Sequence, residues 1–126
     1  MINIQKQIDY WMSGAEDDLV TADLLIRGTR ILHGLFFCHL VIEKSLKAHF
    51  VKKNGDVAPR THNLVILSEN TALELDEDTQ IFLGILMNYQ LQGRYPDYNP
   101  ALPDQDKVMQ YFNKTKALFQ WLKMRL

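Results

Sequence analysis

The chain has 126 residues, 47% of them hydrophobic and 23% charged, and its 14 basic and 15 acidic residues give a formal net charge of -1. This length and composition predict one globular domain, residues 1–126, with enough apolar side chains to form a core. The balanced charge argues against broad nonspecific binding to nucleic acid but leaves room for a local basic patch.

The start of the chain and its single cysteine predict a cytoplasmic protein. The segment "MINIQKQIDYW" has no basic region followed by an apolar region, so we expect no signal peptide. No apolar run approaches the ~18 residues that a membrane span requires, so we expect no membrane association. Cys38 lies in an apolar helical run and is expected to be a buried, reduced thiol.

Two long helices are predicted in the first half of the chain. Apolar residues recur every three or four positions from Ile4 to about Arg27, which predicts the first helix. Gly28 is expected to end it, and Thr29 to cap a second helix over about 30–53. The sequence "NG" is then expected to end the second helix with a residue in the left-handed conformation, as a C-terminal cap.

The second half of the chain is also helical in pattern. Pro59 lies in a loop, and Thr61 is placed to cap a short third helix. The acidic run "LDEDTQ" predicts the start of a fourth helix, over about 77–92, because carboxylates stabilise a first turn. After "GRYPDYNPALPD" breaks the chain, Pro103 is expected in the first turn of a final helix. The pattern predicts an all-α fold, an up-down four-helix bundle with an additional short helix.

The second helix carries a polar stripe on a surface that is otherwise apolar. His39, Glu43 and Lys47 follow at intervals of four and share one side of a helix that is apolar nearly all round. Because an unpaired buried charge is costly, these groups are expected to be paired or to face a water-filled cleft. The alternative is purely structural: a helical Glu43–Lys47 ion pair and a packed, hydrogen-bonded His39.

Asp18 raises the same question on the first helix. It falls in the apolar sector of Trp11 and Ala22, whereas its neighbour Asp17 points elsewhere. We expect Asp18 to pair with Lys44 or Lys47 in a polar cluster between the first two helices. The alternative is a salt bridge whose only role is to fix the register of the helices.

The segment "QLQGRYPDYNP" contains a second candidate cluster. Arg94 and Tyr95 follow a glycine and precede a proline, so a rigid turn would hold them. A planar guanidinium and an aromatic ring suit phosphate and base recognition. The alternative is that Tyr95 packs under the turn while Arg94 pairs with Asp97 or Glu43.

Taken in order, the segments "AEDDLVTADLL", "FCHLVIEKSLKAHF", "THNLVIL" and "RYP" resemble the HEPN domain family. They span roughly residues 11 to 96, and the final helix fits the fold without adding a motif. The resemblance implies a helical bundle that dimerises, a role linked to nucleotides or RNA, and a nucleotidyltransferase-type protein partner.

The resemblance also bears on catalysis. HEPN ribonucleases carry an arginine followed four to six residues later by a catalytic histidine, whereas Arg94 is followed by "YPDYNPAL" and no histidine occurs after His62. The chain therefore resembles the RYP-type branch, in which nucleotide binding without cleavage is expected, and we predict no catalytic residue. The predicted ligand-binding residues are Lys44, Lys47, Arg94 and Tyr95, and the predicted supporting polar cluster is Asp18, His39, Glu43 and His62.

Two other functions remain open. One is a toxin-like ribonuclease in which His39, His49 or His62 replaces the missing histidine. The other is a helical protein–protein interaction module without a ligand. The histidine spacings do not predict a metal site, and no glycine-rich phosphate loop predicts a cofactor.

Two further expectations concern packing. Gly14, Gly34 and Gly84 fall inside helices, where glycine is unfavourable, so at least one is expected in a tight helix–helix contact. A two-fold symmetric homodimer is also expected. Its surface would draw on apolar residues for which the bundle leaves few inner positions: Trp121, Leu126, Tyr98 and Leu102.

Overall fold

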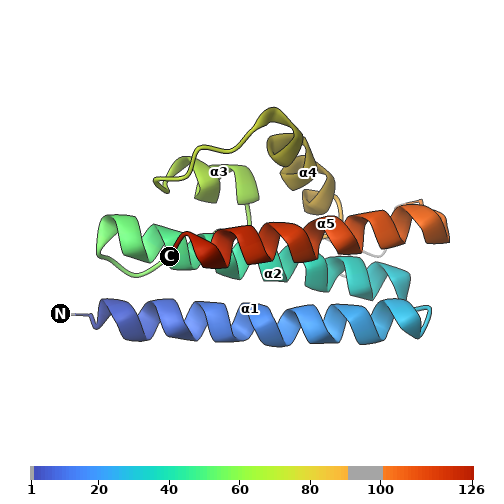
Figure 1. Cartoon of the computed structure of the whole chain (residues 1–126), viewed down its shortest axis with the longest axis horizontal. Helices are drawn as coiled ribbons and strands as arrows, with labels where there is room; N and C mark the ends of the chain where they lie inside the picture. Colours follow the sequence, from blue (N-terminus) through green and yellow to red (C-terminus); the bar gives the residue numbers. More distant parts are fainter. Residues whose placement is uncertain (1, 91–100) are drawn as a thin grey trace.

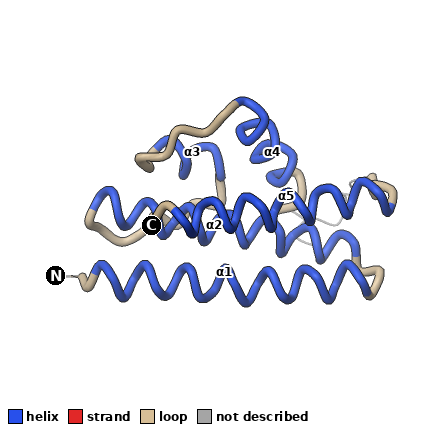
Figure 2. The backbone as a smooth tube through the Cα atoms, in the orientation of Figure 1, coloured by secondary structure: helices blue, strands red, loops and turns tan. Residues whose placement is uncertain are grey.

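The computed structural model describes residues 2–90 and 101–126 and is helical throughout its regular structure (Figure 1). Its elements, in chain order, are α1 (Ile4–Arg27), α2 (Ile31–Asn54), α3 (Leu64–Glu69), α4 (Glu77–Met87) and α5 (Gln105–Met124). No strand occurs in these two ranges, as Figure 2 shows. The predicted all-α fold is confirmed.

The helix α2 is the centre of the molecule. It runs antiparallel to α1, and α5 lies along both of them, while α3 and α4 cover another side of α2 (Figure 1). Each of the other four helices contacts α2. This explains why the second helix has apolar residues on nearly all sides: it is buried from several directions.

Two helix boundaries match the sequence expectations closely. The helix α1 covers the predicted residues, and α2 ends at Asn54 with Gly55 in the left-handed conformation at φ 63°. The Gly55 N–H donates to the carbonyl of Val51, so the predicted cap is confirmed. The helix α4 is shorter than expected, because it ends at Met87 and residues 88–90 form a turn.

Three predicted helix starts were wrong in detail. Thr29 takes a left-handed conformation at φ 64°, and Arg30 occupies the N-cap position of α2 without a side-chain hydrogen bond. The reason is that the chain must reverse within the three residues between α1 and α2, and Thr29 makes that reversal. Its backbone is therefore unavailable for the extended conformation of a cap.

The other two starts shift along the chain. Asn63 caps α3 by accepting from the Ile66 N–H, and the Thr61 hydroxyl instead accepts from the Asn63 N–H. Pro103 precedes the first turn of α5, whose cap is Asp104. At α3 the stronger capping residue Asn63 takes the position expected of Thr61, and at α5 the cap Asp104 starts the helix after the proline rather than before it.

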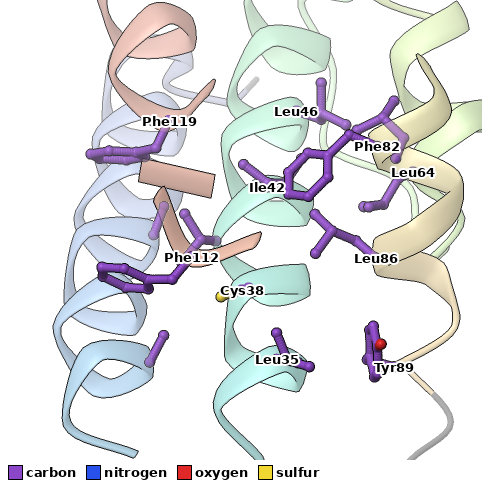
Figure 3. Close-up of a cluster of buried hydrophobic side chains, with 14 of the residues drawn as sticks. Leu35, Cys38, Ile42, Leu46, Leu64, Phe82, Leu86, Tyr89, Phe112 and Phe119 are labelled. Atoms are coloured by element: carbon purple, nitrogen blue, oxygen red, sulfur yellow. The ribbon is translucent and has the colours of Figure 1, made fainter. Parts of the chain in front are cut away.

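The main core surrounds α2 and has buried side chains from all five helices, and Figure 3 shows part of it. Leu35, Ile42 and Leu46 of α2 are fully buried there, and Phe82 of α4 packs among them. The predicted burial of Cys38 is confirmed. Burial raises the pKa of its thiol to about 11, although a hydrogen bond with Thr115 opposes the shift, so the thiol is protonated near neutral pH.

One of the three helical glycines mediates a tight helix crossing, as expected. A Cβ atom on Gly34 would lie 2.5 Å from Cγ1 of Ile26 and 3.4 Å from the Ala22 carbonyl oxygen, both on α1. Gly14 is less crowded, with Cδ of Lys44 at 3.2 Å, and Gly84 has open space around it. The approach of α1 to α2 therefore depends on Gly34.

In the two ranges that the structure covers, no helix is long and apolar enough to cross a membrane.

Candidate functional site

The polar stripe of α2 forms a buried cluster centred on Glu43, whose residue exposure is 4%. One carboxylate oxygen, Oε2, accepts a hydrogen bond from Lys47 Nζ at 3.1 Å. The other, Oε1, lies 3.0 Å from His62 Nδ1 and 3.6 Å from His39 Nδ1. Since a carboxylate only accepts, the His62 Nδ1 atom donates in this pair. The stripe is therefore paired inside the protein rather than solvated.

This cluster joins three parts of the chain. His39, 1% exposed, hydrogen-bonds through Nε2 to the backbone carbonyl of His62, at 3.1 Å. Lys47, 5% exposed, has its ammonium 5.1 Å from the centre of the Trp11 ring of α1, a cation–π distance. The side chain of His62 is 46% exposed, so the imidazole is where the cluster reaches solvent.

Asp18 forms a separate ion pair, with Lys44, as one of the two expected partners. The Lys44 Nζ atom lies 2.7 Å from Asp18 Oδ2, and the two side chains are 28% and 12% exposed. The lysine stem passes over Gly14, whose missing side chain leaves room for it. Both lysines therefore lie near α1, but Lys44 pairs with Asp18 and Lys47 with Glu43, so they belong to different ion pairs.

Two of the predicted ligand residues, Arg94 and Tyr95, lie outside the described residues, as does Tyr98. The predicted supporting residues are all described. The structure brings Glu43, His39 and His62 together and places Asp18 in the neighbouring pair with Lys44.

The arrangement around Glu43 suits proton handling and orientation rather than metal binding. A buried carboxylate that accepts from Nδ1 fixes the ring of His62 and leaves Nε2 as the atom that can exchange a proton with a ligand. In residues 2–90 and 101–126, no group of three or more His, Cys, Asp or Glu side chains is placed to hold a metal ion.

A group of cations at the carboxyl ends of α2 and α5 was not predicted from the sequence. Lys52, Lys53 and Arg125 line a pocket there together with His49 and Trp121. The signal in the sequence was the pair "KK" at the predicted end of one helix and an arginine near the end of another. Only the packing of α5 against α2 brings these two helix ends together.

The whole bundle can be compared with known proteins. The family model for the HEPN domain matches residues 8–125, and so covers all five helices except the first turn of α1. The match includes the final helix, for which the sequence offered no motif. No curated protein and no solved structure gives a significant match. With a family model that covers nearly the full chain, this protein belongs to the HEPN domain family.

Proposed function

We propose that this protein is a non-catalytic HEPN domain of the RYP-type branch that binds a nucleotide or RNA. In this proposal it acts in the cytoplasm as a homodimer, beside a nucleotidyltransferase-type protein partner. Membership of the HEPN family supports the ligand class. The observation that carries the proposal is the buried ionic cluster of Glu43, Lys47 and His62.

The cluster places charged side chains in the protein interior, where apolar side chains are usual. Replacing a buried ion pair with apolar side chains of similar size is often neutral or stabilising, so stability alone does not require Glu43 and Lys47. A cluster that ends in an exposed imidazole instead supplies an oriented polar group at the surface. We therefore assign Glu43 and Lys47 to holding His62 in place.

Direct ligand contacts are assigned to Arg94, Tyr95 and Lys44. The guanidinium and the ammonium would pair with phosphate, and the tyrosine ring would stack on a base. Lys44 remains 28% exposed in its pair with Asp18, whereas Lys47 is too deeply buried to reach a ligand directly. Because these contacts are charged, affinity should fall as the salt concentration rises.

Isothermal titration with ATP, GTP and a short single-stranded RNA tests the proposal. We expect the wild-type protein to bind at least one of them and Arg94→Ala to weaken that binding without lowering the melting temperature. Lys116→Ala, which removes an exposed charge from α5, is the control and should leave affinity unchanged. Binding that is equal in Arg94→Ala and wild type would contradict the site.

A ribonuclease is the second candidate, because one observation favours it. The hydrogen bond from His62 Nδ1 to Glu43 is the arrangement that orients a histidine for general acid–base chemistry. Under our proposal, the purified protein leaves a labelled RNA intact over hours. Cleavage that is abolished by His62→Gln with the fold retained would replace the binding proposal with the ribonuclease.

The third candidate, an interaction module without a ligand, is favoured by the closed surroundings of Glu43 and Lys47. It would stand if none of the three probes binds and no RNA is cut.

A further inference from the structure

A basic pocket lies at the carboxyl ends of α2 and α5, and it is distinct from the Glu43 cluster. It has a volume of about 550 Å³, within the usual range for a small-molecule site. Its lining comes from α2, from the segment between α3 and α4, and from the end of α5: His49, Lys52, Lys53, Ala72, Leu73, Glu74, Trp121 and Arg125.

The cations of this basic pocket have no acidic partner in the described part of the chain. The Nζ atoms of Lys52 and Lys53 donate to backbone carbonyls, at 3.0 Å to Arg125 and 3.4 Å to Thr71. No carboxylate of the described residues lies within ion-pair distance of these lysines or of Arg125. With Glu74 as the one acidic lining residue, the pocket carries a clear positive charge.

His49 does not add to this charge near neutral pH. Burial is the main cause that lowers its pKa below the ordinary value. The hydrogen bond to the Leu122 carbonyl opposes this shift, and the nearby Lys52 adds a smaller lowering effect. The neutral ring donates through Nε2 to the Leu122 carbonyl at 2.7 Å. It therefore forms a fixed wall of the basic pocket.

Two of the cations are held in place before any ligand arrives. The guanidinium of Arg125 lies 3.9 Å from the centre of the Trp121 ring. The hydrogen bond from Lys52 to the Arg125 carbonyl holds the lysine beside it. An ammonium has three donors, so Lys52 keeps two for a ligand, and the stacked guanidinium keeps its N–H donors. Such preorganisation lowers the entropic cost of binding.

Two other pockets in the described structure have the opposite character. The groove between α4 and α5, about 370 Å³, has Glu74, Asp76 and Asp78 against a single lysine, Lys114, in its lining, and it shares Glu74 and Trp121 with the basic pocket. The pocket between α3 and α4 has Glu69 and Glu77. An anion would be repelled from both, so the charge distribution directs it to the basic pocket.

A simpler interpretation is that these cations only neutralise the carboxyl ends of two helices. That effect accounts for a cation in each last turn. It does not explain why three cations line the same pocket together with the indole ring of Trp121.

We propose that the basic pocket binds phosphate, with Lys52, Lys53 and Arg125 as the contacts. The source of the phosphate is either the polyphosphate of a nucleotide or the backbone of single-stranded RNA. The proposal rests on the proposed function for its choice of ligand, but it uses none of the residues assigned there.

Nuclear magnetic resonance of the two tryptophan indole N–H groups gives a direct test with a built-in control. Sodium tripolyphosphate, ATP and an oligouridylate are titrated separately into labelled protein. We expect the Trp121 signal to shift, whereas the Trp11 signal, which reports on Lys47 and the Glu43 cluster, shows separately whether a probe also reaches that cluster. A shift with tripolyphosphate and ATP alone assigns the pocket to nucleotides, and a shift that is much larger with oligouridylate assigns it to RNA.

The double variant Lys52→Ala/Lys53→Ala provides the second test, with Lys6→Ala/Lys116→Ala as a control that removes the same charge from exposed positions elsewhere. We expect at least about tenfold weaker binding of the assigned ligand for the first variant and no such loss for the control. For RNA, the slope of log affinity against log salt should become less steep by about 1.4, since each phosphate contact contributes roughly 0.7.

Equal affinity in the two double variants, or a Trp121 signal that does not move with any probe, would overturn the phosphate pocket. If Arg94→Ala nevertheless weakens ATP or RNA binding, the proposed function survives and this inference alone fails. If Lys52→Ala/Lys53→Ala weakens binding and Arg94→Ala does not, the inference stands and the Arg94 site fails.

Discussion

Glu43 accepts hydrogen bonds from two side chains that arrive from different directions, Lys47 one turn along α2 and His62 from the segment before α3. Its carboxylate is almost completely buried, and so is the ammonium of Lys47. Each charge makes the burial of the other tolerable. The consequence is that single substitutions in this cluster should be far more damaging than combined ones.

We predict that Glu43→Gln lowers the free energy of unfolding by about 3–5 kcal/mol, because it leaves the buried Lys47 charge without its partner. Adding Lys47→Met to Glu43→Gln should restore part of this loss, since the charge itself is then removed. Urea unfolding followed by circular dichroism measures both. Glu69→Gln, an exposed carboxylate on α3, is the matched control and should change little. Additive effects of the two cluster substitutions would contradict the coupling.

His49 makes the stability of the folded protein depend on pH. Burial lowers its pKa from the ordinary value of 6.5, so the folded protein takes up a proton there only at lower pH than the unfolded chain does. In the window below about pH 6.5 the unfolded state therefore binds more protons, and stability falls as pH falls.

We predict that the wild-type protein loses free energy of unfolding between about pH 7 and pH 5, with His49 contributing at most about 1.4 kcal/mol per pH unit. His49→Gln can still donate to the Leu122 carbonyl but cannot take up a proton, so its pH dependence should be shallower. Unfolding curves for both proteins at the two pH values make the comparison. Parallel pH dependences would show that His49 does not contribute.

At the scale of elements, the contact between α1 and α2 is set by small residues. Gly34 and Ala22 let the two backbones approach, and Ile26 fills the space over Gly34. The helix α4 lacks such a contact at its own glycine, because a Cβ atom on Gly84 would have no neighbouring atom within 4 Å. The two glycines are thus in the same secondary structure with opposite surroundings.

We predict opposite stability changes for Gly34→Ala and Gly84→Ala. The first forces Ile26 and the α1 backbone away and should cost about 1–3 kcal/mol. The second gains helix propensity without a clash and should stabilise by about 0.5–1 kcal/mol. Thermal unfolding of both variants and of the wild-type protein compares their melting temperatures. Similar melting temperatures for both would mean that α1 and α2 can adjust their spacing freely.

At the scale of the whole molecule, the surface bears on self-association. Of the residues expected on an exposed apolar surface, Leu102 is 65% exposed. Trp121 and Leu126 are partly covered by neighbouring side chains, while Tyr98 lies outside the described residues.

A different apolar surface lies along α1, where three large side chains are highly exposed: Tyr10, Val20 and Leu24. On a helix they fall within roughly 80° of one another, so they form one stripe on the side of α1 away from α2. Exposed apolar side chains gathered on one face are typical of an interface.

We predict a homodimer of twice 14.7 kDa in sedimentation at micromolar concentration, because the α1 stripe would be buried in it. Leu24→Glu should shift it toward monomer, because a charge would be buried in the interface. Leu102→Glu changes an equally exposed leucine outside the stripe, at a position that the sequence had offered for the interface, and should not dissociate the dimer if the stripe forms it. A single 14.7 kDa species for the wild-type protein would refute dimer formation, and dissociation by Leu102→Glu alone would relocate the interface.

Local pattern was enough to predict most of the fold. The periodic apolar residues of α1 and α2, the Asn54–Gly55 ending and the acidic start of α4 each depend on interactions within a few residues, which the sequence displays directly. The misplaced caps at Thr29 and Thr61, and the predicted placement of Pro103 inside the first turn of α5, show the limit of local pattern. Several capping residues stand near each start, and the path of the connecting loop selects among them.

The polar residues could be found in the sequence, but their partners were decided by the tertiary structure. Spacing placed His39, Glu43 and Lys47 on one stripe, yet only the docking of the segment before α3 brings His62 to Glu43. Asp18 needed a lysine on α2, and the rotation of α2 about its axis chose Lys44 over Lys47. The sequence showed the cations of the basic pocket but not their meeting, since Lys52 and Arg125 are 73 residues apart and come together because α2 and α5 end side by side. The spacing of apolar residues in the sequence shows which face of a helix is buried. The pairing of charges depends on distances between side chains of different elements, which only the packing of those elements sets.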